Sequence, residues 1–442
     1  MFSRPQALSA TELARLESVW QAPGLKATLV SVFCAFGGWA LLMPVIPLAV
    51  IETGGSERMA GLSTGIFMGA TVFTQYFTPR ILRRVGYFPV MAIAGLLLGL
   101  PAVIHAFSLG TSAVVAVAII RGVGFGAVTV AEAALIADLV PPHLVGRSSG
   151  LFGVVVGFTQ LVGFPLGMWV YDHFGGPSVF GLAAVYAIVG SCAAFGLPVK
   201  DRSQEQPTKT TTKKKPATVG TWKLATVPGL LIATAAVGFA AFSTFLAPAA
   251  ADIDPAKAAT VAGLTLAVVG AAQTFARAFA GWWADRVGEP GKLAVIGLLF
   301  ALVGVLAGGV TISAEPQGAA LVAACLGAAA IFGAGFGFAQ SEALLLLFYR
   351  LPRERSAEAS ALWNMCFDSG TGAGAIVLGV VAGAFAYQGA FFGAAIVIFG
   401  GVCAVVIDRV LGRHRIAEQD NVRLRLRSLG SRARVRRHKD TQ

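Results

Sequence analysis

Five ionisable side chains lie inside long apolar stretches of this 442-residue sequence: Arg121, Glu132, Arg277, Glu342 and Asp368. A charged side chain at bilayer depth costs roughly 2.5 to 3.5 kcal/mol on insertion scales, so such residues are usually kept for a function. Burial favours the neutral form of a carboxyl group, which lets it gain and lose a proton near neutral pH. These residue types therefore predict proton or cation chemistry inside a membrane.

The spacing of these residues suggests how they are arranged. Arg121 and Glu132 are eleven residues apart, which puts them on nearly the same helix face about 16 Å apart. The alternative for both is that they brace helix packing by pairing with another helix. Asp368 lies near the middle of its apolar stretch and is expected to be a proton or cation site, or a structural partner of Arg277. Glu342 lies closer to one end, where a gating or packing role is expected.

The apolar stretches have the length of transmembrane helices. A helix rises 1.5 Å per residue, so about 20 residues cross the roughly 30 Å of bilayer hydrocarbon. The stretches are apolar around most of their circumference, unlike the amphipathic helices of a soluble protein. The sequence predicts an all-α membrane protein with twelve transmembrane helices, over residues 27–51, 60–79, 87–107, 112–137, 148–171, 178–198, 225–250, 259–282, 292–312, 318–348, 357–384 and 390–411.

Positive charge collects at every second connection between the predicted helices. Of 34 Lys and Arg residues, all but Arg58, Arg121, Lys257 and Arg277 lie near the N-terminus, in even-numbered connections or in the C-terminal tail. Since cytoplasmic loops retain positive residues, both termini are expected in the cytoplasm. The formal charge of +12 is scattered over these loops, which argues against a nucleic-acid-binding face. The tail is expected to contact anionic lipid head groups or to be a solvated tail without function.

A basic segment rich in Lys, Thr and Pro divides the predicted helices six and six. Its composition cannot bury enough apolar surface to fold, so a flexible linker is expected. The predicted parts are an N-terminal cytoplasmic segment (1–26), a six-helix bundle (27–199), the linker (200–223), a second bundle (224–411) and the basic tail (412–442). An internal repeat supports this division, because Gly124-Phe-Gly126 and Glu132 are echoed 211 and 210 residues later by Gly335-Phe-Gly337 and Glu342.

Three motifs connect these features to a known family. Gly281-Trp-Trp-Ala-Asp285-Arg286-Val-Gly288 resembles the Gly-x-x-x-Asp-Arg-x-Gly signature of the major facilitator superfamily. The segment beginning Arg121-Gly-Val-Gly124 resembles the arginine-bearing motif of its fourth helix, and Gly157 to Gly167 resembles, imperfectly, its antiporter motif in the fifth. The resemblance implies the major facilitator fold, in which two six-helix bundles rock about a central site. It also implies a proton relay, for which the candidates are Arg121, Glu132, Glu342 and Asp368.

The second copy of the family signature implies a latch at the cytoplasmic ends of the helices. In a facilitator fold Asp285, with Arg286, Gly281 and Gly288 around it, is expected near the start of the fifth helix. Arg147 lies there, together with free amide groups at the helix start, and both favour a carboxylate. We therefore expect Asp285 and Arg147 to hold the inner gate.

The first copy of the signature, between the second and third predicted helices, departs from the family pattern. Arg83 stands where the family has an acid, and the start of the eleventh helix carries Glu354 and Glu358. We expect a charge-reversed latch in which Arg83 pairs with one of these glutamates. The alternative is that the glutamates only complement the dipole of their own helix.

The predicted helices contain few polar side chains, which argues against a sugar pathway. Each polar group left unpaired on binding costs about 1 to 3 kcal/mol, so a sugar needs many matched hydrogen bonds. A hydrophobic or amphiphilic small molecule fits the composition better. The residues expected to line its pathway are Trp39, Gln160, Arg277, Gln340, Trp363 and Asn364.

The leading hypothesis is a secondary active transporter that exports such a molecule by proton-coupled alternating access, similar to proton-coupled drug and metabolite exporters. The alternatives are uptake of a small metabolite by proton symport and a non-transporting membrane sensor or scaffold. An enzyme is not expected, and neither is a cofactor or metal site, because nucleotide-binding and His/Cys motifs are missing. The expected partners are a small-molecule substrate, protons and membrane lipid, without nucleic acid. A monomer in the plasma membrane is expected, the inner membrane in a bacterium.

Overall fold

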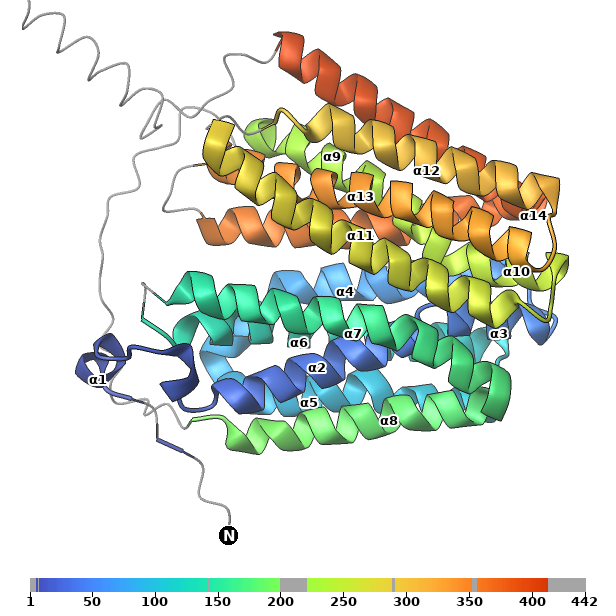
Figure 1. The fold of residues 1–442 in the computed structure, drawn as a ribbon. Coiled ribbons are helices and arrows are strands. Elements are labelled where there is room, and N and C mark those ends of the chain that lie inside the picture. Colours follow the sequence, from blue (N-terminus) through green and yellow to red (C-terminus); the bar gives the residue numbers. More distant parts are fainter. Residues whose placement is uncertain are drawn as a thin grey trace, which may run out of the picture.

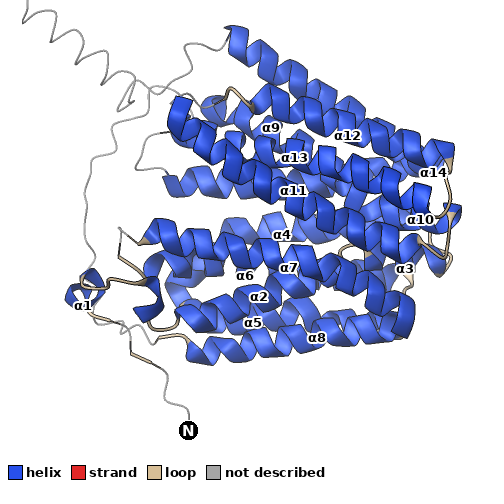
Figure 2. Cartoon of the chain, in the orientation of Figure 1, coloured by secondary structure: helices blue, strands red, loops and turns tan. Residues whose placement is uncertain are grey.

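Helices make up nearly all of the chain described by the computed structural model (Figure 2). It describes residues 5–6, 8–141, 144–198, 221–287, 291–351 and 356–411. Ten described segments are long and apolar enough to cross a membrane, the last being Glu358–Val410. That segment makes two crossings, because the backbone is not helical at Phe385 and Ala386. With α4 (Glu57–Val85), which packs among them, the described helices give the twelve crossings predicted.

The first six crossings form one bundle, in the lower half of Figure 1. The short α1 (Ala10–Ala14) and η1 (Val19–Gln21) precede it. The first crossing is interrupted at Pro44, because proline lacks the N–H group that would continue the helical hydrogen bonds. The elements of the bundle are α2 (Leu25–Leu42), α3 (Val45–Glu52), α4, α5 (Tyr87–Gly99), η2 (Leu100–Ala106), α6 (Thr111–Asp138), α7 (Val145–Phe174), α8 (Gly176–Ala193) and η3 (Ala194–Gly196).

The remaining crossings form a second bundle, in the upper half of Figure 1. Its first crossing contains one turn of π-helix, a local widening that is frequent at functional sites. The elements are α9 (Thr221–Ala240), the π-helix η5 (Ala241–Phe245), α10 (Leu246–Ile253), α11 (Ala258–Val287), α12 (Ala294–Ala314), α13 (Ala319–Arg350) and α14 (Ser356–Leu411).

Several helices extend further than the apolar stretches predict. Arg83, expected in a loop, lies in the last turn of α4, and Asp285 likewise lies within α11. Arginine is a good helix former, so α4 continues until Gly86, whose φ of 83° ends it. The predicted linker is shorter, since α9 begins at Thr221, and its residues 200–220 lie outside the described chain, as does the tail 412–442.

The repeated Gly-Phe-Gly motif makes the same contact in both bundles. A Cβ added to Gly126 would lie 2.4 Å from the carbonyl oxygen of Thr71 in α4. A Cβ added to Gly337 would lie 2.4 Å from the carbonyl oxygen of Gln273 in α11. Only glycine lets the two backbones approach so closely. Each bundle is therefore held together by the same glycine contact at corresponding crossings.

The two bundles meet along two seams, α4 against α14 and α7 against α11. In the first seam, a Cβ added to Gly61 would lie 2.2 Å from the carbonyl oxygen of Ala375. In the second, a Cβ added to Gly263 would lie 2.7 Å from the Cα of Pro165. Both seams thus bring backbone against backbone, because small residues stand at the contact points.

The seams are not continuous along the helices. We call the end of the bundles that carries Arg83, Arg147 and Arg350 the basic end. Toward it, a Cβ added to Gly153 of α7 or Gly281 of α11 would meet nothing within 4 Å. The ends of α7 and α11 are also further apart on that side of the molecule, the left in Figure 1. The bundles are therefore closed at the opposite end and separated at the basic end.

Candidate functional site

Arg121 lies in a pocket of the first bundle, between α2, α4 and α6. It is 5% exposed, its Nε donates to the carbonyl oxygen of Leu98 at 3.0 Å, and its guanidinium lies 5.2 Å from the ring centroid of Phe67. Nε is its only nitrogen with a hydrogen-bond partner among the described residues. Trp39 and Thr64 also line this pocket, whose cavity volume in this conformation is about 20 Å³. Arg121 is thus a buried cation held by a carbonyl and a ring, without an ion-pair partner in the described chain.

Two aromatic rings, those of Trp39 and Phe67, line this pocket, and a separate aromatic cluster lies in the second bundle. Trp39 stacks on Phe125 with centroids 5.5 Å apart, and its indole nitrogen has no hydrogen-bond partner among the described residues. In the second bundle Phe336 stacks on Phe367, which in turn stacks on Trp363 at 5.8 Å. The two tryptophans predicted to line the pathway therefore each belong to an aromatic stack, one in each bundle.

Asp368 binds across the seam between the bundles. Its Oδ2 accepts a hydrogen bond of 2.7 Å from Nε2 of Gln75, and both side chains are buried. Gln75 belongs to α4 and Asp368 to α14, so this contact joins the two bundles. Asp368 and Arg277, whose side chains are both described, form no ion pair. The partner of Asp368 is the amide of Gln75, not the predicted Arg277.

A chain of amides crosses the second seam. Nε2 of Gln273 donates to Gln160 at 2.9 Å, and Nε2 of Gln340 donates to Gln273 at 3.0 Å. Nη1 of Arg277 then donates to Oε1 of Gln340 at 3.2 Å. The indole N–H of Trp363 donates to the backbone carbonyl oxygen of Gln340. The structure thus brings four of the predicted pathway residues into one polar network, with Gln273 as its centre.

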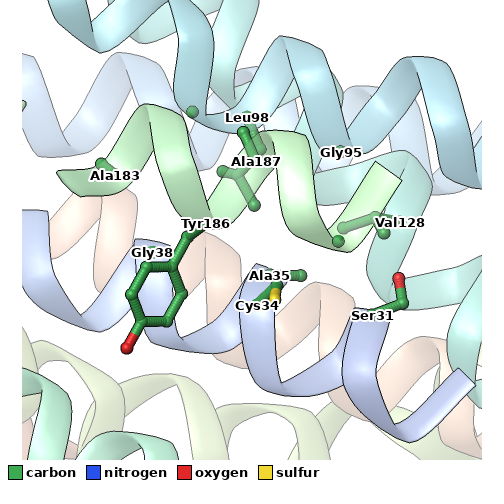
Figure 3. A pocket seen from close by; sticks show the side chains of 12 residues that line it. Ser31, Cys34, Ala35, Gly38, Gly95, Leu98, Val128, Ala183, Tyr186 and Ala187 are labelled. Atoms are coloured by element: carbon green, nitrogen blue, oxygen red, sulfur yellow. The ribbon is translucent and has the colours of Figure 1, made fainter. Parts of the chain in front are cut away.

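Glu132 is fully buried inside the first bundle. Its Oε1 accepts a 2.8 Å hydrogen bond from Ser31, and its Oε2 has no partner among the described residues. Ser31 also lines a cavity between α2, α5, α6 and α8 (Figure 3). Small residues such as Ala35, Gly95 and Ala187 make up much of its wall, all from the first bundle. Glu132 therefore lies within one bundle, away from the seams that join the two.

The two remaining predicted residues of the helices lie nearer the basic end. Glu342 is buried in α13 and accepts a hydrogen bond from the backbone N–H of Gly291, just before α12. Asn364 is exposed and donates to the carbonyl oxygen of Ser360 in its own helix at 3.0 Å. In this conformation Glu342 thus binds the connection before α12, and the hydrogen bond of Asn364 stays within its own helix.

The predicted latch residues lie at the basic end, where the bundles are apart. Arg83, Arg147 and Glu358 are exposed, and the structure describes no ion pair between Arg83 and Glu358. Gly281 lies in α11, and Asp285 and Arg286 follow it in the same helix, but their side chains are not among those described. Gly288 and Glu354 lie outside the described residues. Both latches remain predictions for the conformation that is closed at this end.

Two residues that hold the buried carboxylates are absent from the predicted site. Gln75 gives a signal in the sequence, since it is one of few amides in the apolar stretches. Ser31 gives none, because serine is common in membrane helices. Among the residues that the structure describes, no group of three or more His, Cys, Asp or Glu could hold a metal ion.

Comparison with protein families decides what kind of protein this is. The chain matches the family model described as Major Facilitator Superfamily over residues 28–375 and 256–438. The chain belongs to the Major Facilitator Superfamily. It is therefore a multi-pass membrane protein of a family of secondary transporters, not of enzymes.

Two proteins of one bacterium resemble part of this chain in sequence. They are described as uncharacterized MFS-type transporters of Mycobacterium tuberculosis, MT1926 of strain CDC 1551 / Oshkosh and Rv1877 of strain ATCC 25618 / H37Rv. Each is 27% identical over 153 residues, which is 33% of this chain and 21% of the relative. The match thus spans only about one fifth of these relatives' length.

Solved structures of other facilitators share the fold over most of their length. The peptide transporter POT in complex with sulfate is 16% identical with a TM-score of 0.69, covering 93% of this chain and 100% of that one. The D-xylose-proton symporter is 16% identical with a TM-score of 0.69, covering 92% and 100%. The nucleoside transporter NupG is 14% identical with a TM-score of 0.67, covering 88% and 98%. At these identities the likeness concerns the fold alone.

Proposed function

We propose that this facilitator exports a hydrophobic or amphiphilic small molecule in exchange for protons. The observation that carries the proposal is the hydrogen bond from Gln75 to Asp368, which joins a buried carboxylate of one bundle to the other bundle. A proton that binds Asp368 acts directly on a contact between the two moving parts. The protonation state of one residue is thereby linked to the separation of the bundles.

The size of this link follows from hydrogen-bond energetics. A hydrogen bond to an ionised group contributes about 1.5 to 3 kcal/mol, and one between neutral groups about 0.5 to 1.5. Protonation of Asp368 therefore weakens the seam by about 1 kcal/mol, which changes the ratio of two conformations roughly fivefold. The proton favours the arrangement in which this seam is open and the basic end is closed.

The environment of the pathway supports the choice of cargo. Trp39, Phe125, Phe336 and Trp363 offer ring faces, and the polar groups of the second seam already bind one another. A sugar would have to break these hydrogen bonds, whereas a molecule with an aromatic or aliphatic body uses the rings. We also propose that the basic end faces the cytoplasm and that the membrane is the plasma membrane, because basic residues are retained inside.

The test is transport in proteoliposomes with an imposed pH gradient and a panel of dyes and metabolites. In Asp368→Asn, gradient-driven movement of cargo should be lost while exchange without a gradient persists. Asp172→Asn changes an exposed carboxylate at the end of α7 and should transport like the unaltered protein. Full pH-driven transport by Asp368→Asn would refute the role of this residue, and movement of cargo together with protons would replace export by symport.

A further inference from the structure

The pocket around Arg121 contains a positive charge that the protein does not neutralise. Arg121 is 5% exposed and takes part in no ion pair within the described chain. The buried carboxylates Glu132 and Asp368 bind other partners, since Glu132 accepts from Ser31 and Asp368 accepts from Gln75. Buried charges in proteins are normally paired, because an isolated charge in an apolar medium is very unfavourable. The contacts to Leu98 and Phe67 compensate only part of this cost.

A second donor in the same pocket is also without a partner. The indole nitrogen of Trp39 is buried and makes no hydrogen bond to any described residue. The hydroxyl groups nearby are already used, because Ser63 donates to Ala60 and Thr64 accepts from Thr244. The pocket thus presents a guanidinium and an N–H group as donors. None of its lining residues is an acid.

We propose that the cargo is an organic anion with an aromatic or aliphatic body, whose acid group binds Arg121 and the indole N–H of Trp39. This inference rests on the proposed function and narrows its cargo. A carboxylate or similar oxyanion matches two donor groups, and its apolar body would lie on the rings of Phe67 and Phe125. A cationic cargo would meet the repulsion of Arg121, and a neutral one would leave the charge unpaired.

The position of the pocket allows a bound anion to affect both bundles. Thr244 of the π-helix η5 donates to Thr64 of α4 at 3.3 Å, so the second bundle touches the pocket wall. An anion in the pocket therefore binds next to a contact between the bundles. Its release or uptake can change that contact without a carboxylate of the protein taking part.

The experiment measures equilibrium binding to the full chain in phosphatidylcholine nanodiscs, without a pH gradient. The three probes share one ring system: 2-naphthoate is an anion, 2-naphthamide is neutral and 2-naphthylmethylammonium is a cation. We expect naphthoate to bind about tenfold more tightly than the amide and the cation to bind weakest. Arg121→Gln should abolish the preference for the anion, and Arg121→Lys should keep part of it. Arg80→Gln, which removes an exposed arginine of α4, should keep all of it.

A second variant covers the case in which Arg121→Gln does not fold. Trp39→Phe keeps a ring against Phe125 but removes the N–H group, and it should weaken naphthoate binding about threefold. Unchanged naphthoate binding in this variant, or an anion preference that survives in Arg121→Gln, would overturn the inference. So would equal binding of the three probes by the unaltered protein.

An anionic lipid offers the same head-group chemistry as a free anion. The binding measurement is therefore repeated in nanodiscs that contain phosphatidylglycerol. Retained naphthoate binding supports a small-molecule site, and loss of it would assign the pocket to a lipid instead. Failure of anion binding while Asp368-dependent transport persists refutes this inference alone, and the reverse result refutes the proposed proton coupling alone.

Discussion

At the scale of single residues, the buried polar groups of this transporter are bound mainly by uncharged partners. Asp368 is bound by an amide and Glu132 by a hydroxyl, and the exposed Arg277 donates to an amide oxygen. The buried pair Arg350 and Asp408 is different, and it lies within the second bundle near the basic end. Neutral partners leave the charge of a residue free to change, whereas an ion pair fixes it. The residues between the bundles are therefore of the kind that can titrate or rearrange.

The amide pair across the second seam gives a prediction at this scale. Gln160→Leu and Gln273→Leu should each lower the share of molecules closed opposite the basic end, because each removes the hydrogen bond of 2.9 Å between them. A neutral hydrogen bond contributes about 1 kcal/mol, so the shift is about fivefold. The double variant should show less than the sum of the two effects, measured as cysteine accessibility at the basic end. Strict additivity would mean that the two amides do not act together.

Part of this scale could be predicted from the sequence and part could not. Charged residues in apolar stretches can be recognised from the sequence alone. The free-energy cost of placing such a residue in a membrane depends only on the stretch that contains it. The hydrogen-bond partners of these residues cannot be recognised in this way. Gln75 is 293 positions away from Asp368, and only the packing of the two bundles brings them together. The partners of Gln273 cannot be predicted either, because Gln160 and Gln340 belong to two different helices.

At the scale of helices, glycine determines which surfaces touch. Gly126 and Gly337 hold corresponding crossings together within each bundle, and Gly61 brings α4 against α14 between the bundles. The number of crossings can be predicted, because an apolar run of about 20 residues is the length that spans the bilayer. Helix ends were predicted less well, because α4 and α11 continue past the hydrocarbon until a glycine or the end of the described segment.

Gly61→Leu tests the seam between α4 and α14. Its Cβ would lie 2.2 Å from a backbone oxygen of Ala375, which cannot rotate away as a side chain can. Overpacking of this kind costs about 1 to 3 kcal/mol, so transport should fall roughly tenfold while the protein still folds. Gly69→Leu in the same helix should keep normal transport, because a Cβ there meets nothing within 4 Å. Equal rates for both variants would show that the seam tolerates a side chain at Gly61.

The charge-reversed latch is a prediction for the opposite conformation. Arg83 and Glu358 are both exposed at the basic end while the bundles are apart. Arg83→Glu should slow transport severalfold, and adding Glu358→Arg should restore it, because the pair is re-formed with opposite signs. Exposed pairs contribute about 0 to 1 kcal/mol, so the amount of folded protein should not change. Losses that simply add in the double variant would exclude this contact, and Glu354→Arg offers the same test for the neighbouring glutamate.

At the scale of the whole molecule, the two bundles are closed at one end and open at the other. The contacts of the first seam extend from Glu57 to Gln75, and in the second seam Gly157 lies beside Thr274 whereas a Cβ at Gly153 would meet nothing within 4 Å. This arrangement is one of the two that alternating access requires. The two-bundle architecture could be predicted from the repeat and the linker, but the conformation could not, because the same sequence must adopt both.

Cysteine labelling checks the conformation and the orientation together. In a variant without Cys34, Cys192, Cys325, Cys366 and Cys403, the Gly153→Cys side chain should react rapidly with a membrane-impermeant maleimide. The reaction should occur in inverted vesicles and not in intact cells if the basic end faces the cytoplasm. Gly270→Cys, whose Cβ would contact Gln160, should react at least about tenfold more slowly. Labelling of Gly153→Cys from outside the cell would reverse the orientation.

The glycine contacts between α4 and α14 also make the transporter dependent on its lipid surroundings. Lipid tails are as apolar as helix faces, so closing this seam gains no hydrophobic free energy and relies on close packing and on the hydrogen bond from Gln75 to Asp368. The lipids compete for the same helix faces whenever the seam opens. The ratio of the two conformations should therefore depend on bilayer thickness and lateral pressure. Changing the length of the lipid acyl chains should then change the transport rate, and this effect requires no lipid bound at a specific site.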